Sequence, residues 1–452
     1  MIIVHTLIHL HPIQHVPRLF VNGLVVELEN SFVDSHRVYY KKDIATENTE
    51  EDEFMNKRNI VTRDAFASIP LLVSCLILLC VLCGQSKAQD FKTLKPGVEY
   101  AEVTKEISGL KVNMNLLRLD LKKVRIDVHH AMDAAIGTEK TSSIATRHGA
   151  FAAINAGFFR LDNSIWAGDD VGALQIDRKL LSESTNDRIA LMISNDSPFA
   201  PVLMERVRQN YDIRVSSTVR GVLRFDISAS GINRERKKGE IIVFTPEFNR
   251  TTLTNNDGTE VIVRPGRCSV VRQGQGSSQI PSDGFVISAE TNRVAELAAF
   301  SKCTTRGSLF ANVTTVDKSG NTRFIFPPRN RIEDVIAGAP QLINNGKIDI
   351  TWQEEKSSKS FVETRHPRTA VAKLKDGKFL MITVDGRSES SGGIGLQDLA
   401  EYLLSLGATD AMNLDGGGST TMFVDGKVVN HPSDKEGERK VSDALVVTLR
   451  KK

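Results

Sequence analysis

Three consecutive glycines follow an aspartate in the segment from Asn413 to Ser419. Gly416, Gly417 and Gly418 permit positive φ angles and let backbone N–H groups approach an anion, because no Cβ stands in the way. The segment follows a strand-like run, a position at which loops often carry function. A plain flexible turn is the competing interpretation. No lysine follows where a Walker loop requires one, so the segment predicts an anion-binding loop and not an NTPase.

Two arginines could meet this loop. Arg368 begins a strand-like run, and Arg387 follows Asp385 and a glycine at the end of the next run. If the two runs form a hairpin, both guanidinium groups emerge at the same end of a sheet. Arginine forks suit phosphate oxygens better than lysine does, so the pair is a candidate phosphate clamp. A surface salt bridge with Asp385 or Glu389 is an equal alternative.

Two carboxylates are well placed for catalysis. Asp385 and Asp415 each end an apolar run and are each followed by glycine. Paired carboxylates can divide the roles of nucleophile or base and of acid. The competing interpretation, a simple Asp-Gly turn, describes Asp376 and Asp425 well. Asp385 and Asp415 differ, because an arginine or a glycine run follows them.

Further polar residues could contact a sugar. Asn155 and Asn413 could hold sugar hydroxyls, or could be buried amides that satisfy the backbone. Asp170 could add acid to the site, as could Asp169, or either could cap a loop. We predict Asn155 as a catalytic residue and Asn413, Thr369 and Asp170 as sugar-binding residues.

The sequence predicts neither a metal centre nor a serine nucleophile. The histidines beyond residue 88 show no metal-ligand spacing; they are His129, His130, His148, His366 and His431. Ser419 does not lie in a G-x-S-x-G elbow, so we assign it to phosphate binding with the glycines. No cofactor is expected, although the sequence leaves a divalent cation open.

Strands and turns must position these residues. The runs from Thr369 to Leu374 and from Phe379 to Val384 alternate around an Asp-Gly turn, which predicts a hairpin. Apolar residues from Leu396 to Leu404 recur with helical spacing, and Gly407 is the expected C-terminal stop. Most other runs resemble short strands. We therefore predict an α+β fold of mixed or antiparallel β-sheets with few helices, in which one catalytic domain carries a β-rich insertion.

The expected organisation has five segments. Residues 1–54 contain no periodic apolar stretch and are expected to be non-native or disordered. Residues 55–88 resemble a secretory signal, with basic residues after Met55, an apolar run from Ile69 to Leu82 and a small-x-small cleavage site. That run is short for a membrane helix. The catalytic domain is predicted in two halves, 89–195 and 331–452, separated by the insertion at 196–330.

Composition limits the classes of partner. The 452 residues carry a formal net charge of +3 with no block of Lys or Arg, so nucleic acid is not an expected partner. Two cysteines remain beyond the signal, Cys268 and Cys303, and either a disulfide in an exported protein or two buried thiols would account for them. A secreted or periplasmic location without stable membrane insertion follows from the signal.

Four segments occur in an order that resembles the phosphodiester glycosidase family. They are Asn155 to Phe159, Arg365 to Ala370, Val384 to Arg387 and Asn413 to Thr420. The resemblance covers most of 89–452 and is least distinctive in 196–330. It implies hydrolysis of the bond between an anomeric carbon and a phosphodiester oxygen, as in an N-acetylglucosamine-1-phosphodiester.

The resemblance also implies roles for the residues. Asp385 or Asp415 would face the anomeric carbon, while Arg368, Arg387 and the loop amides would hold the phosphate. The substrate would be a sugar-phosphodiester, for example in an envelope or extracellular glycan.

Two alternatives remain open. A non-catalytic glycan-binding protein could use the same scaffold, although it would not need both carboxylates. A phosphodiesterase could instead cut the P–O bond.

Overall fold

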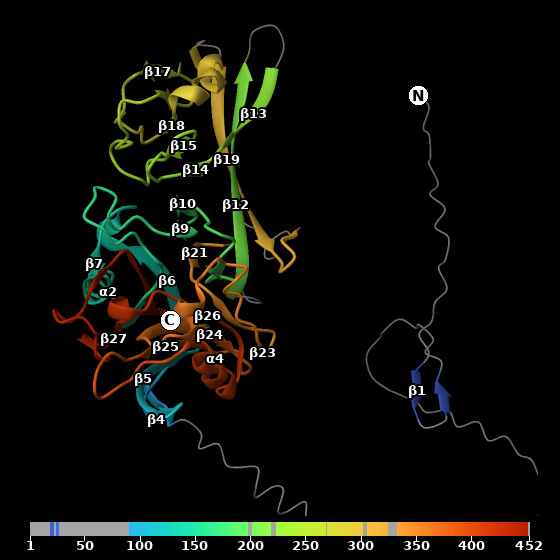
Figure 1. Cartoon of the computed structure of the whole chain (residues 1–452), viewed down its shortest axis with the longest axis vertical. Helices are drawn as coiled ribbons and strands as arrows, with labels where there is room; N and C mark the ends of the chain where they lie inside the picture. The colour runs from blue at the N-terminus through green and yellow to red at the C-terminus, as the bar shows by residue number, and fades with distance from the viewer. Residues whose placement is uncertain are drawn as a thin grey trace, which may run out of the picture. The chain divides into compact units, whose positions relative to one another are not determined.

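The computed structural model describes residues 19–21, 24–26, 90–197, 201–217, 223–267, 269–301, 305–323 and 332–450 (Figure 1). The chain divides into two compact units, Met1–Lys87 and Ala88–Lys452. In the first unit the structure describes a short antiparallel hairpin of β1 (Leu19–Val21) and β2 (Leu24–Val26). The predicted signal segment, Cys268 and Cys303 lie outside the described residues, so those expectations stay predictions.

An eight-stranded sheet carries the two runs that we expected to form a hairpin. In spatial order its strands are β23 (Lys347–Ile348), β22 (Gln341–Asn344), β26 (Ala408–Asn413), β24 (Arg368–Leu374), β25 (Phe379–Val384), β5 (Leu110–Leu119), β4 (Val98–Ile107) and β3 (Lys92–Lys95). The hairpin of β24 and β25 is confirmed, with Arg368 opposite Val384. Gly377 has a φ of 80°, which the tight turn requires.

Both faces of this sheet are covered, which explains why nearly every residue of its central strands β24 and β25 is buried. On one face, Ala370 and Ile382 pack with Leu399 and Leu403 of α4 (Leu396–Ser405). The helix that the apolar spacing predicted is therefore confirmed, and it buries the predicted stripe. On the other face, Val371 and its neighbours join a second core shared with the other sheets.

A five-stranded sheet lies across that second core. Its strands are β28 (Lys427–Val428), β27 (Met422–Val424), β8 (Ala152–Asn155), β30 (Asp443–Leu449) and β6 (Val124–His130). Ile154 and Leu445 pack in the same core as Val371. Strand β8 pairs with both β27 and β30, so the expected strand ending at Asn155 is held between two C-terminal strands.

Two further sheets contain most strands of the middle of the chain. One has the order β10 (Lys179–Ser182), β9 (Leu174–Ile176), β21 (Asp334–Ala337), β11 (Ile189–Ile193), β12 (Val202–Ser217), β19 (Thr305–Val316) and β20 (Thr322–Arg323), with β13 (Leu223–Ala229) beside β12. The other has the order β14 (Gly231–Ile232), β15 (Ile241–Phe244), β18 (Phe285–Ala289), β16 (Thr259–Val263) and β17 (Val270–Gln273).

Strand β12 joins these regions. Its first residues pair with β11, and its last residues lie between β13 and β19. Figure 1 shows it as one long strand that runs from beside β21 to beside β13. The sheet is therefore continuous across the first residues of the predicted insertion, whose limits stay a prediction.

The remaining elements are short. They are the paired strands β29 (Lys440–Val441) and β7 (Glu139–Lys140) and the helices η1 (Ala131–Asp133), α2 (Thr141–Arg147), η2 (Thr291–Ser301), α3 (Lys359–Glu363) and η4 (Gly417–Ser419). Antiparallel strands with few helices confirm the expected α+β class.

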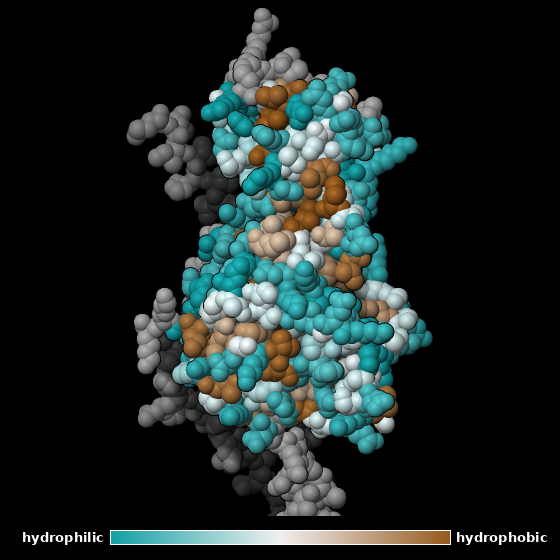
Figure 2. Space-filling model, turned by 90° about the vertical axis from the view of Figure 1, so that its left-hand side faces the viewer, coloured by the Kyte–Doolittle hydropathy of each residue, from teal (hydrophilic) through white to brown (hydrophobic). Residues whose placement is uncertain are grey.

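One side of the molecule has a mainly polar surface. The face shown in Figure 2 is mostly hydrophilic, and its hydrophobic side chains form scattered groups. Such groups are normal on folded proteins. No helix among the described residues combines the length and the hydropathy that crossing a bilayer requires.

Candidate active site

The Asp385-Gly386 and Asp415-Gly416 steps lie at the same end of the eight-stranded sheet. Strand β24 begins at Arg368, and its neighbours β25 and β26 both end beside that start. Asp385 follows β25, and Asp415 follows β26 after one further residue. Antiparallel pairing thus places the two aspartate residues on either side of Pro367 and Arg368.

Glycine is required where these steps pass the backbone of Pro367. A Cβ on Gly416 would lie 2.8 Å from the Pro367 carbonyl oxygen, and one on Gly386 would lie 2.9 Å from its nitrogen. Real Cβ atoms essentially never approach other atoms so closely. In addition, Gly417 N–H donates to the Pro367 oxygen at 2.9 Å. The close approach fixes the position of each aspartate relative to the other.

Asp385 is a buried, oriented carboxylate. It is 6% exposed, and its Oδ1 accepts hydrogen bonds from Asn430 Nδ2 at 3.2 Å and from the His431 amide at 3.0 Å. Burial raises the pKa of Asp385, while these two donors lower it in part. No other described residue donates to Oδ2. The bonds at Oδ1 therefore fix the carboxylate and leave its second oxygen available.

Asp415 has a different environment. Its Oδ1 accepts from the Gly416 amide at 2.9 Å, and its own amide donates to the Ala156 oxygen at 2.9 Å. Burial raises the pKa of Asp415 to about 6, although the nearby Ser419 hydroxyl and the Gly416 amide lower it. A carboxylate with this pKa is ionised at neutral pH and can accept a proton there.

Arg387 lies over the glycine loop. Its backbone is left-handed, with a φ of 59°, and its side chain is exposed. Its Nη2 lies 3.3 Å from His366 Nδ1 and only 3.1 Å from where a Cβ of Gly417 would be. Burial and then the charges of Arg368 and Arg387 lower the pKa of His366. Arg387 is therefore the exposed positive charge beside the loop.

Arg368 is bound within the protein. It is 1% exposed, and its guanidinium donates to the carbonyl oxygens of Phe361 at 2.6 Å, Thr364 at 2.9 Å and Ile394 at 3.3 Å. Its guanidinium also stacks over the Phe361 ring, 4.8 Å from the centroid. Burial and the charge of Arg387 lower its pKa to about 10, so it stays positive at neutral pH. These bonds anchor the end of α3 beside the site.

Asn155 links three segments of the site through hydrogen bonds. It is fully buried; its Oδ1 accepts from Thr369 Oγ1 at 2.7 Å and from the Thr421 amide at 3.1 Å. Its Nδ2 donates to the Asp415 carbonyl oxygen at 2.7 Å. Asn155 and Thr369 thus use their polar atoms on each other and on the loop backbone, which is the structural alternative that the sequence left open.

Several backbone amides of the glycine loop already donate hydrogen bonds to neighbouring groups. The amides of Gly416 and Gly417 donate to Asp415 and Pro367, and the Ser419 amide donates to the Gly416 oxygen at 3.2 Å. Within the described chain, only the Gly418 amide of the three glycines has no recorded acceptor. The loop consequently offers fewer donors to an anion than its composition suggests.

Asn413 and Asp170 do not join Asp385 and Asp415 directly. Asn413 is fully buried, and its Nδ2 donates to the oxygens of Ala339 at 2.7 Å and Leu414 at 2.8 Å. Asp170 instead pairs with His130 Nε2 at 3.1 Å and accepts from Ser442 Oγ at 2.7 Å.

Asp443 connects the Asp170 group to the Asn155 segment. Its Oδ1 accepts from the Gly157 amide at 2.6 Å, two residues beyond Asn155. Burial and the neighbouring Asp170 carboxylate raise the pKa of Asp443 well above its usual value. The predicted sugar-binding residues therefore lie around the site rather than in one place.

Several residues of the site were not predicted from the sequence. Asn430 and His431 orient Asp385, and Ser391 Oγ donates to the Asp385 carbonyl oxygen at 2.6 Å. Arg439 pairs with Asp434 at 2.7 Å, and this pair packs against Gly418. The Asn-His-Pro sequence after β28 was the available signal for the first two. No signal marked the others, because they reach the site through loops.

Comparisons with known proteins find similar sequences over part of this chain. Residues 257–448 match the family model of phosphodiester glycosidases. N-acetylglucosamine-1-phosphodiester alpha-N-acetylglucosaminidase of Bos taurus is 35% identical over 119 residues, which are 24% of this chain and 22% of that protein. A prophage-derived protein of Bacillus subtilis is 44% identical over 87 residues, 19% of this chain and 13% of that protein. The match thus spans less than a quarter of the length of these relatives.

Two crystal structures share the fold. A hypothetical protein from Synechocystis aligns with a TM-score of 0.66 at 22% identity, over 81% of this chain and 65% of that chain. A protein from Burkholderia pseudomallei aligns with a TM-score of 0.61 at 22% identity, over 75% of this chain and 74% of that chain. The sequence match over residues 257–448 shows that this part of the chain is similar to phosphodiester glycosidases.

Proposed function

We propose that this protein is an exported hydrolase that cleaves the sugar C1–O bond of a sugar-1-phosphodiester of the N-acetylglucosamine-1-phosphodiester type. One observation carries the proposal. Asp385 and Asp415 flank the start of β24, and the exposed guanidinium of Arg387 lies beside the glycine loop that follows Asp415. This arrangement offers two carboxylates to a sugar and a positive charge to a phosphate. The family match supports the same chemistry.

The two carboxylates have different roles in this proposal. Asp385, held at Oδ1 by Asn430 and His431, faces the anomeric carbon and stabilises the positive charge that develops there. Asp415 accepts the proton of the attacking water. The C1–O bond breaks with its electron pair on the phosphate oxygen, the water oxygen bonds to C1, and Asp415 holds the released proton.

Arg387 takes the phosphate in this proposal. It is exposed, and a guanidinium can donate two parallel hydrogen bonds to phosphate oxygens. The departing phosphate monoester is stable as an anion, so it needs positive charge more than it needs a proton. Arg368 supports the site through α3, because its guanidinium is already bound to three backbone oxygens. Asn155 and Thr369 position the loop that carries Asp415.

Hydrolysis of a synthetic N-acetylglucosamine-1-phosphodiester in water labelled with heavy oxygen tests the proposal. We expect free sugar to be released with the label in the sugar. Label in the phosphate would instead indicate a phosphodiesterase that cuts the P–O bond. Binding without turnover would indicate the non-catalytic glycan-binding alternative, and both results contradict the proposal.

A matched pair of variants links the activity to the site. Asp415→Asn and Asp425→Asn make the same chemical change in two Asp-Gly steps, but Asp425 lies in the turn between β27 and β28. Asparagine tolerates the positive φ of 47° at position 425. Turnover should be lost in the first variant and kept in the second.

Export is part of the proposal and has its own test. It is supported by the basic segment after Met55, the apolar run from Ile69 to Leu82 and the cleavage site before Gln89. Expression of the full chain followed by N-terminal sequencing of the exported fraction should find Gln89 first. Leu78→Arg, in the apolar run, should keep the protein inside the cell. Export of that variant, or a different first residue, would contradict the assignment.

A further inference from the structure

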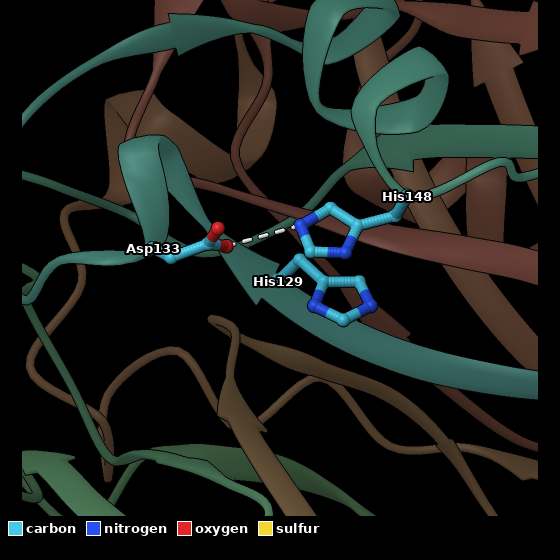
Figure 3. Close-up of side chains that lie close together, drawn as sticks. All are labelled: His129, Asp133 and His148. Atoms are coloured by element: carbon cyan, nitrogen blue, oxygen red, sulfur yellow. Dashed lines mark hydrogen bonds and ion pairs between the residues drawn. The ribbon is translucent and has the colours of Figure 1, made fainter.

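Three potential metal ligands meet away from the sugar-phosphodiester site. His129 belongs to strand β6, Asp133 ends the short helix η1, and His148 directly follows helix α2. Figure 3 shows the two imidazole rings stacked on each other, with the Asp133 carboxylate directed at the His148 ring. Three different elements thus bring together a set of nitrogen and oxygen ligands.

The distances within this group suit one ion. His148 Nε2 lies 3.0 Å from Asp133 Oδ1, and the ring centroids of His129 and His148 are 3.5 Å apart with an interplanar angle of 9°. One ligand atom from each residue lies within 4.8 Å of the others. Ligands of one zinc ion, bound at roughly 2.0–2.2 Å, are about 3–4 Å apart. Because an imidazole lone pair lies in the plane of its ring and the two rings are nearly parallel, the rings must turn away from this stacked arrangement to bind a single ion.

The electrostatic surroundings favour a cation. Asp177 and Glu247 line the same cavity and are acidic, whereas Lys179 is the basic residue there. The cavity is therefore lined by more carboxylate groups than ammonium groups.

Arg147 shows that the group already attracts positive charge. Its guanidinium pairs with Asp133 and lies 3.0 Å from His148 Nε2. Arg147 also donates to Glu139 Oε2 at 2.8 Å and to the His130 carbonyl oxygen at 3.3 Å. It can therefore keep two partners while a metal takes Asp133 and His148. A hydrogen bond from outside also commonly orients a carboxylate ligand.

The cavity in front of the group allows an ion to enter. Its volume is about 580 Å³, and it is open to solvent. All three ligand residues line it. Three protein ligands in an open cavity leave a fourth coordination position for water or another small ligand.

The backbone that presents Asp133 is strained. Met132 and Asp133 have consecutive positive φ angles of 56° and 54°, and neither is glycine. Such conformations cost energy and collect at functional sites. This strain is consistent with a turn held in place for the direction of the Asp133 carboxylate.

We propose that His129, Asp133 and His148 bind one divalent transition-metal ion of the zinc type at a site separate from the sugar-phosphodiester site. Mixed imidazole and carboxylate ligands suit zinc and its neighbours in the first transition series better than magnesium or calcium. The ligands are not spaced along the sequence as in known metal motifs, so sequence analysis did not predict this site. The proposal does not depend on sugar hydrolysis.

Titration of the full chain with zinc chloride, after removal of metals with a chelator, tests this site. Isothermal titration calorimetry should show one more equivalent of zinc bound by the wild-type protein than by the double variant His129→Ala with His148→Ala. The comparison between variants is needed because the first 36 residues contain five more histidines. Equal stoichiometry in the two proteins would overturn the proposal, and would mean that the stacked histidines serve packing alone.

Two further variants protect the test against misfolding. Asp133→Asn keeps the size of an exposed side chain and should weaken zinc binding at least tenfold. Asp177→Asn removes an acidic residue of the same cavity that is outside the ligand group, and should leave the stoichiometry unchanged. Cobalt(II) should give visible absorption bands in wild type and Asp177→Asn that are lost in the double variant. Bands of equal intensity in all three proteins would contradict the assignment.

Discussion

Gly416 passes Pro367 so closely that a Cβ on the glycine would lie 2.8 Å from the proline oxygen. The backbone of Gly416 is extended, with φ of −128° and ψ of −153°, so an alanine could adopt it. The requirement for glycine at this position is therefore one of space. Asp415 depends on this contact, because it is the residue directly before the glycine.

Gly416→Ala should accordingly displace the loop. Overpacking of this kind typically lowers the free energy of unfolding by about 1–3 kcal/mol. The folded variant should also have a lower kcat than wild type, because the displaced loop moves Asp415. Chemical denaturation and steady-state kinetics measure the two effects. Unchanged kinetics would show that the contact does not position Asp415.

The dependence of activity on pH should report Asp415. Its pKa of about 6 means that the carboxylate is ionised above that pH and protonated below it. If Asp415 is the base, kcat/KM should fall as the pH drops through about 6. A profile that stays flat from pH 7 to pH 5 would assign the base to another group.

Replacement of Arg387 should weaken the interaction with phosphate. A charge-assisted hydrogen bond contributes about 1.5–3 kcal/mol, so Arg387→Gln should lower kcat/KM about 10- to 100-fold. Arg387→Lys should restore part of this loss, because it keeps the charge without the fork. Arg214→Gln is the control, because Arg214 is an exposed arginine that pairs with Asp226. Both residues lie on the paired strands β12 and β13, in a different sheet from β24 and β25. An equal loss in Arg214→Gln would show that the effect is not specific to phosphate.

Asn155→Ala should destabilise the fold as well as the site. The change leaves the Thr421 amide and the Asp415 carbonyl oxygen without their buried partner, which typically costs about 1–3 kcal/mol for each unsatisfied group. Denaturation should therefore show a clear loss of stability. A variant with normal stability and no activity would instead support a direct catalytic role for Asn155.

Asp169 should make stability depend on pH. Burial and the neighbouring Asp170 and Glu183 raise its pKa to about 8, whereas an unfolded aspartate titrates near 4. Between these values the folded protein holds a proton that the unfolded chain has lost, so this group's contribution to stability decreases as the pH rises from 4 to 8.

Asp169→Asn should remove this dependence. The melting temperature of the variant should be close to that of wild type at pH 4 and higher by a few degrees at pH 8. Thermal denaturation of both proteins across this range measures the difference. A difference that does not grow with pH would contradict the assignment.

The local elements of the site could be predicted from the sequence because their signals are local. The Asp-Gly turn between β24 and β25 and the apolar spacing of α4 specify those elements within short windows. Hairpin pairing then fixed Asp385 beside Arg368. Asp385 and Asp415 lie at the same end of the sheet because β26 is the other neighbour of β24. This neighbour is set by pairing between strands that are distant in the sequence.

The use of each polar group could not be predicted. Arg368 resembles a phosphate ligand in the sequence, but the end of α3 supplies carbonyl oxygens that occupy its guanidinium. Likewise Asp170 pairs with His130, which lies on β6 40 residues earlier in the chain. Such partners depend on how loops from separate sheets meet, and no short sequence window contains that information.

The contacts of Asn155 have a consequence for the life of the protein in the cell. Its partners Thr369, Asp415 and Thr421 lie 214, 260 and 266 residues later in the chain. The ribosome must therefore make nearly the whole polypeptide before these bonds can form. Shortened chains that end before Thr421 lack a complete site, so the site is assembled only once synthesis is almost finished.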